Sequence, residues 1–87
     1  MDSLTIQFTG FKQVRLILIR DGQQIDAVDF AFDSNLDTKL IDSIDKLLKE
    51  NRIDPLSLHT VSVGGDVDEN SSAYKVAISC AEALKTL

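Results

Sequence analysis

The spacing of apolar residues changes near residue 36, and this change restricts the folds open to the chain. Before that point apolar and polar residues alternate, as at Leu4, Ile6 and Phe8, and a period of two predicts strands. Asp21 and Gly22 separate two of these runs and are typical of a hairpin tip, because both tolerate the positive φ of a type I′ turn. The pattern therefore predicts a three-stranded antiparallel meander. Its strands are expected at residues 4–8, 14–19 and 25–32.

The second of these strands is apolar on both sides. Leu16 and Leu18 point one way, while Ile17 and Ile19 point the other. Strands of this kind are typical of a sheet that is covered on both faces. We therefore expect structure to pack against both faces of this strand.

Later in the chain the apolar residues recur at helical spacing. One stripe, about 140° wide around a helix, contains Leu36, Leu40, Ile41, Ile44, Leu47 and Leu48. Asp54–Pro55 ends this helix. A short strand at 60–63, an acidic loop at 66–70 and a last helix at 73–86 follow.

The resulting order, β-β-β-α-β-α, predicts one α/β domain over residues 1–87. A helix that connects a meander to one more strand implies a mixed sheet, with the fourth strand parallel to the first. This is the opening arrangement of ribonuclease-H-like and actin-like ATPase domains.

The last helix has more apolar surface than one sheet can bury. One face consists of Ala73, Val76, Cys80, Ala83, Leu84 and Leu87, and an adjacent face of Tyr74, Ala77, Ile78 and Ala81. Either the first helix covers the second face, or that face contacts another molecule. For the second case the predicted interface consists of Tyr74, Ala77, Ile78 and Ala81, with Lys46 and Lys49 of the first helix at the rim.

Composition excludes several classes of function. The chain has 9 Lys and Arg against 14 Asp and Glu, and its net charge of −5 argues against binding nucleic acid or an anionic membrane through a basic surface. A single cysteine cannot form an internal disulfide, which favours a reducing compartment, the cytoplasm. The longest apolar run, Leu16 to Ile19, is far too short to cross a bilayer.

Residue spacing along almost the whole chain resembles the N-terminal half of the TsaB (YeaZ) family. The segment Leu4 to Gly22 has the strand-turn-strand layout with which that family begins, and Leu47 to Gly65 follows the end of its first helix and its next strand. Ala73 to Lys85 is similar to its helix of small residues. The resemblance implies an actin-like fold in a partner subunit of bacterial tRNA threonylcarbamoyladenosine biosynthesis, whose N-terminal lobe pairs through its two helices.

The sequence departs from this family at the positions where a nucleotide's phosphates would bind. Phe8 stands where the family has an aspartate, and the acidic run Asp66 to Asn70 replaces a glycine-rich loop. Phosphate binding needs backbone N–H groups and glycines rather than carboxylates. We therefore expect no nucleotide site, no cofactor and no catalytic residue. The family's C-terminal lobe has no counterpart in these 87 residues.

The remaining candidates for chemistry have simpler explanations. The first strand carries no acidic residue to hold the metals of a nuclease, and Asp66 to Asn70 lacks the spacing of a calcium loop. His59 stands in no catalytic motif, and Cys80 lies on an apolar helix face, where cysteine acts as a small hydrophobe.

The sequence thus predicts a non-enzymatic interaction domain that pairs with itself or with a TsaB- or TsaD-like protein through its two helices. The alternative is half of an actin-like ATPase or kinase that completes a nucleotide site with another chain. A third possibility is a domain of this fold whose function has diverged entirely.

Overall fold

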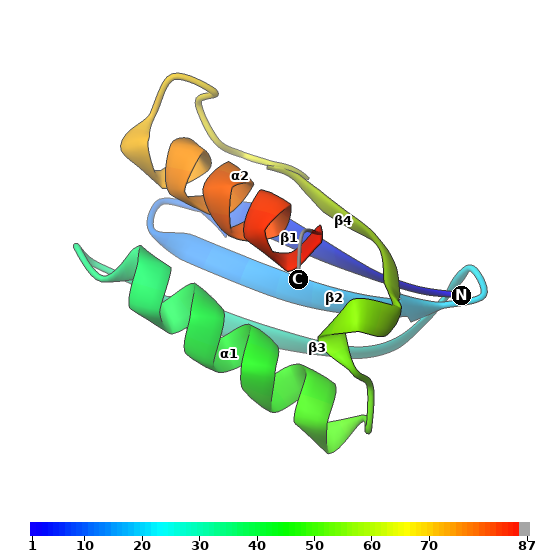
Figure 1. Ribbon diagram of the computed structural model, residues 1–87. Coiled ribbons are helices and arrows are strands. Elements are labelled where there is room, and N and C mark those ends of the chain that lie inside the picture. The colour runs from blue at the N-terminus through cyan, green and yellow to red at the C-terminus, as the bar shows by residue number, and fades with distance from the viewer. Residues whose placement is uncertain (86–87) are drawn as a thin grey trace.

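The computed structural model describes residues 1–85 and confirms the predicted order of elements (Figure 1). Residues 86 and 87, which the sequence places at the end of the last helix, lie outside the described residues. The strands are β1 (Asp2–Gly10), β2 (Gln13–Arg20), β3 (Gln23–Ala31) and β4 (Leu58–Gly65). The helices are α1 (Leu36–Glu50), the short 3₁₀ turn η1 (Pro55–Ser57) and α2 (Ser72–Lys85). Neither α1 nor α2 is long and apolar enough to cross a membrane, and the same holds for the rest of the described chain.

The four strands form one mixed sheet in the order β3-β2-β1-β4. β2 pairs antiparallel with both β1 and β3, whereas β4 pairs parallel with β1, as predicted. Asp21 and Gly22 form the β2–β3 turn with φ angles of 51° and 82°. The hairpin predicted from this Asp-Gly pair is therefore confirmed.

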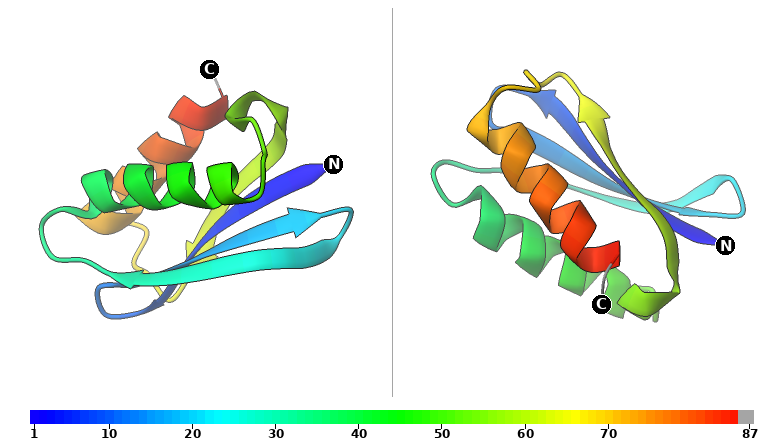
Figure 2. Two further views of the ribbon diagram at one scale, coloured as in Figure 1. Left: turned by 90° about the horizontal axis from the view of Figure 1, so that it is seen from below. Right: turned by 45° about the horizontal axis from the view of Figure 1, so that its top comes forward.

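Both helices cover the same face of the sheet (Figure 2). On that side Leu4, Ile6, Leu16 and Leu18 are fully buried beneath them. From α1 the core receives Leu36, Leu40, Ile44, Leu47 and Leu48, all at most 5% exposed. Burying each such side chain stabilises the fold by about 1.5–3 kcal/mol before conformational entropy is counted.

The other face of the sheet carries no helix in the described chain, so the prediction of a strand covered on both sides is wrong (Figure 2). Ile17 and Ile19 lie on this open face and are only partly buried. Their direct neighbours on β1 are Thr5 and Ser3. Isoleucine favours strands because its branched side chain fits the pleated surface, and this preference does not require a second layer.

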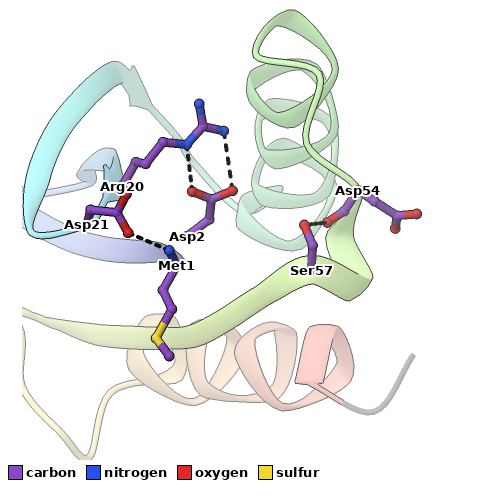
Figure 3. A network of polar contacts seen from close by, with 6 residues as sticks. All are labelled: Met1, Asp2, Arg20, Asp21, Asp54 and Ser57. Carbon is purple, nitrogen blue, oxygen red and sulfur yellow. Dashed lines mark hydrogen bonds and ion pairs between the residues drawn. The ribbon is translucent and has the colours of Figure 1, made fainter.

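Ion pairs connect neighbouring strands near their ends. Arg20 of β2 donates to both carboxylate oxygens of Asp2 at 2.9 and 3.3 Å, and the Met1 ammonium lies 2.6 Å from Asp21 (Figure 3). Arg15 of β2 likewise donates to both carboxylate oxygens of Asp29 on β3. Each guanidinium lowers the pKa of its aspartate below the ordinary value.

Asp26 connects the sheet to the end of α1. The Asn51 side-chain amide donates to its carboxylate at 2.9 Å, and the Ala27 N–H donates at 2.8 Å. These hydrogen bonds, the Asn51 bond first, lower the pKa of Asp26. Because this pKa is lower in the folded state than in the unfolded state, the carboxylate stabilises the fold above the unfolded value, and this contribution is lost as the pH falls through the folded value.

We therefore expect Asp26→Asn to reduce the acid sensitivity of the domain. Between about pH 5 and pH 2 its melting temperature should fall less than that of the parent chain. The matched control is Asp42→Asn, which removes a carboxylate from the exposed surface of α1. Equal slopes for the two variants in thermal melts across this range would contradict the role given to Asp26.

Candidate functional site

The residues predicted to form an interface on α2 divide into two groups. Ala77 is fully buried and Ala81 is 3% exposed, and both belong to the core of this chain. The prediction that they contact another molecule is therefore wrong. Their small side chains let α2 lie close to the sheet, where it packs against β4. Tyr74 and Ile78 are partly exposed, so their role as contact residues stays a prediction.

The two predicted rim lysines lie on the exposed surface of α1. Lys49 pairs with Asp45 at 2.9 Å, and Lys46 lies 3.9 Å from Glu50. Exposed pairs at this helical spacing contribute only about 0.3–0.5 kcal/mol each. Both lysines are therefore free to change partners at little cost, and their place at the rim of an interface stays a prediction.

The structure also shows an apolar groove between α1 and α2 that the sequence does not predict. It encloses about 430 Å³, and Ile41 forms its α1 side. Val76, Cys80 and Ala83 form its α2 side, while Asp37, Lys75 and Ser79 also line it. Burial raises the pKa of the Cys80 thiol, so this side chain is neutral and apolar at neutral pH.

The helical spacing predicts that Ile41 is buried, but 60% of it is exposed. It stands at the margin of the apolar stripe of α1, next to Leu40, which is fully buried. The stripe is wider than the surface that the sheet can cover. The position of Ile41 at that margin is the one sequence signal that could have identified the groove.

Hydrogen bonds within the acidic loop between β4 and α2 stabilise its conformation. Asn70 N–H donates to the Asp68 carboxylate at 2.9 Å, and Ser71 N–H donates to the Asp68 carbonyl oxygen at 2.9 Å. The Ser71 hydroxyl then accepts from Tyr74 N–H at 3.2 Å and caps α2. Asp66, Asp68 and Glu69 are exposed. Within residues 1–85 no three side chains of the metal-binding types lie close enough together to hold an ion.

Phe8, which the sequence resemblance sets against an aspartate of the TsaB (YeaZ) family, is part of the core. It is 3% exposed, and its ring packs edge-on against Phe32 with 6.4 Å between the centroids. The side chain at this point thus stabilises the fold. His59 is exposed at the start of β4. The enzyme alternative stays a prediction.

A solved structure with a similar fold is YeaZ from Pseudomonas aeruginosa. The superposition has a TM-score of 0.78 and covers 98% of this chain, at 14% sequence identity. It covers 38% of the YeaZ chain, so this sequence spans well under half of that protein. No protein-family model and no curated protein matches the sequence. The predicted α/β fold is confirmed as YeaZ-like, and at this identity the likeness shows the fold alone.

Proposed function

We propose that this chain is a non-enzymatic protein–protein interaction domain related to the TsaB (YeaZ) family. It pairs through the layer formed by α1 and α2 with a second copy or with a related protein of the TsaB or TsaD kind. The observation that carries this proposal is the apolar groove centred on Ile41, which is 60% exposed. Isolated apolar residues are common on surfaces, but an apolar groove with a polar rim is typical of a contact site.

Two further observations support the proposal. Phe8 fills the core at the position where the family has an aspartate, and the loop after β4 presents carboxylates instead of a glycine-rich cradle. Pairing through helices requires neither an aspartate at this position nor a glycine-rich loop. The proposal includes a role as a partner protein in tRNA threonylcarbamoyladenosine biosynthesis and a location in the cytoplasm. The YeaZ-like fold is consistent with both.

The substitution Ile41→Glu tests this function. A carboxylate in the groove would be desolvated on pairing, so we expect weaker association while the fold is retained. The matched control is Leu56→Glu, because Leu56 is similarly exposed, at 65%, but lies on η1. Light scattering behind size exclusion, over a micromolar dilution series, should show a lower average mass for Ile41→Glu at every concentration and an unchanged mass for Leu56→Glu.

Two results would contradict the proposal. One is an average mass of 9.6 kDa for the parent chain throughout the series, which would contradict pairing with a second copy. The other is stabilisation of the isolated domain by ATP in a thermal melt, which would favour the ATPase alternative.

A further inference from the structure

Charge is distributed unevenly between the two helices and the rest of the chain. α1 has four acidic residues and three lysines, and α2 has one acidic residue and two lysines, so together the helices are electrically neutral. Subtracting these five of each sign from the 14 acidic and 9 basic residues of the whole chain leaves 9 against 4. The net charge of −5 therefore lies outside the helices. Two copies repel each other over most of their surfaces, but not over the helix layer.

Two opposite charges stand on the two sides of the groove between the helices. Asp37 lines it from α1 and Lys75 lines it from α2, and both side chains are exposed. Within residues 1–85 neither side chain forms an ion pair. The Asp37 carboxylate accepts only from the N–H of the adjacent Thr38, at 2.8 Å. The groove thus presents one carboxylate and one ammonium that are available to another molecule.

The two charges lie at the same end of the groove. A second pocket, of about 320 Å³, borders the groove and shares Asp37 and Val76 with it, whereas Ala83, two turns further along α2, lines only the groove. α1 and α2 run side by side in roughly the same direction (Figure 1). Asp37 therefore faces the first turns of α2, where Lys75 lies, and Ile41 faces the turn that follows.

We propose that the groove pairs with the same groove of a second copy, through ion pairs between Asp37 of each copy and Lys75 of the other. This pairing rests on the proposed function and specifies its partner. The two-fold axis runs along the groove, so α1 of each copy lies over α2 of the other and the helices keep one general direction. Asp37 then meets Lys75 of the second copy, and Ile41 meets the turn of α2 that contains Cys80.

Such a contact is self-complementary, as two-fold symmetry requires. Of the described residues that line the groove, only Asp37 and Lys75 are charged, so two ion pairs use all of these charges. The remaining lining residues are apolar or small, namely Ile41, Val76, Ser79, Cys80 and Ala83. A strongly acidic or strongly basic partner would match only one of the two charges. A second copy matches both, and it also covers the exposed part of Ile41.

The direction of the axis follows from the same two charges. An axis perpendicular to the helix layer would reverse α2 of the second copy. Asp37 would then lie opposite the end of α2 that contains Ala83, and neither Asp37 nor Lys75 would gain a partner. An axis along the groove is therefore the arrangement that pairs both charges.

A charge-reversal series, measured by sedimentation equilibrium of the 87-residue chain, tests this arrangement. Asp37→Lys and Lys75→Asp each bring like charges together at both symmetry-related positions. We expect each change to raise the dissociation constant of the dimer about tenfold. The double variant Asp37→Lys/Lys75→Asp has the net charge of the parent chain. It should recover most of the affinity, because the ion pairs form again with their signs exchanged.

Matched controls change the charge by the same amount outside the groove. Asp42→Lys is the control for Asp37→Lys, and Lys39→Asp is the control for Lys75→Asp, because both control positions are exposed on α1 and neither lines the groove. We expect both controls to keep the dissociation constant of the parent chain within about twofold. Circular dichroism checks that each variant is folded. Recovery in the double variant excludes loss of the fold as the cause of weaker association.

Three results would overturn the inference. The first is that the double variant does not recover affinity, and the second is that the controls lose as much affinity as the groove variants. The third is a parent chain that stays at 9.6 kDa, which leaves pairing with a related protein in place.

Ile41→Glu separates this inference from the proposed function. If Ile41→Glu weakens association while the charge series does not follow the expected order, the groove is a contact site and the pairing of Asp37 with Lys75 is wrong. If the parent chain associates and neither Ile41→Glu nor the charge variants change its dissociation constant, both the inference and the proposed function fail.

Discussion

Ala77→Glu is expected to unfold the domain. Ala77 is fully buried between α2 and the sheet, so a glutamate there places a carboxylate in a core whose described residues are all apolar. Removing an unpaired charge from water costs several kcal/mol. A loss of about 4 kcal/mol or more is expected, which matches the entire stability of about 4–5 kcal/mol that a domain of this size has at about 0.05 kcal/mol per residue. Circular dichroism at 25 °C should show the loss of helix signal.

The sequence by itself predicts the opposite for this variant, which makes the measurement informative. If Ala77 lay on a contact surface, Ala77→Glu would dissociate an assembly and leave the circular dichroism unchanged. The matched control is Ser79→Glu, two residues further along α2 at an exposed position, which should keep the native spectrum. A folded, monomeric Ala77→Glu protein would show that α2 does not bury this face.

Gly65→Ala is expected to lower the free energy of unfolding by about 3 kcal/mol. Gly65 ends β4 with a φ of +97°, which side-chain-bearing residues rarely adopt. A Cβ there would overlap the Phe8 carbonyl oxygen and lie 2.7 Å from the Phe8 nitrogen. Backbone strain and overpacking each cost about 1–3 kcal/mol, and neither can relax while β4 pairs with β1. Urea unfolding followed by circular dichroism gives the value.

The adjacent glycine supplies the control. A Cβ at Gly64 would meet no atom within 4 Å, and its φ lies outside the left-handed region. Gly64→Ala should therefore change the free energy of unfolding by less than about 1 kcal/mol, in either direction. If the two variants lose equal stability, the close contact of Gly65 with β1 is not what requires glycine.

The elements that the sequence predicts correctly depend on local chemistry. The alternation at Leu4, Ile6 and Phe8 identifies β1, and the Asp-Gly pair identifies the hairpin, because each signal acts over a few neighbouring residues. The parallel pairing of β4 follows from chain connectivity. These features are sufficient to predict the order β-β-β-α-β-α and the fold.

The errors arise where helix orientation decides the outcome. Periodicity shows that α2 is apolar over a wide arc, but not which part of the arc meets the sheet. The small residues Ala77 and Ala81 meet it, because they permit the closest approach. On α1 the stripe is oriented so that Leu40 and Ile44 enter the core, and Ile41 is left exposed at its margin.

The open face of the sheet has a similar explanation. Ile17 and Ile19 have the composition of a doubly covered strand, yet both helices of the described chain lie on the other side (Figure 2). The type of a side chain indicates how well a residue fits a strand. Which face of the sheet the helices cover depends instead on the path of the chain. For the same reason, the sequence predicts the proposed contact residues of α1 and α2 only in part. The helical pattern gives Tyr74 and Ile78 as candidates and sets Ile41 at the margin of its stripe, whereas only the structure shows that Ile41 and α2 line a groove.

A dilution series monitored by two-dimensional ¹H–¹⁵N NMR tests the central claim most directly, because it maps any self-association onto residues. If the helix layer pairs with a second copy, the amide signals of Ile41, Val76 and Cys80 shift or broaden from micromolar to near-millimolar concentration. Signals from the open face of the sheet, such as Arg15, should stay unchanged. Amide signals of α1 and α2 that do not move over this range would contradict pairing through the helix layer with a second copy.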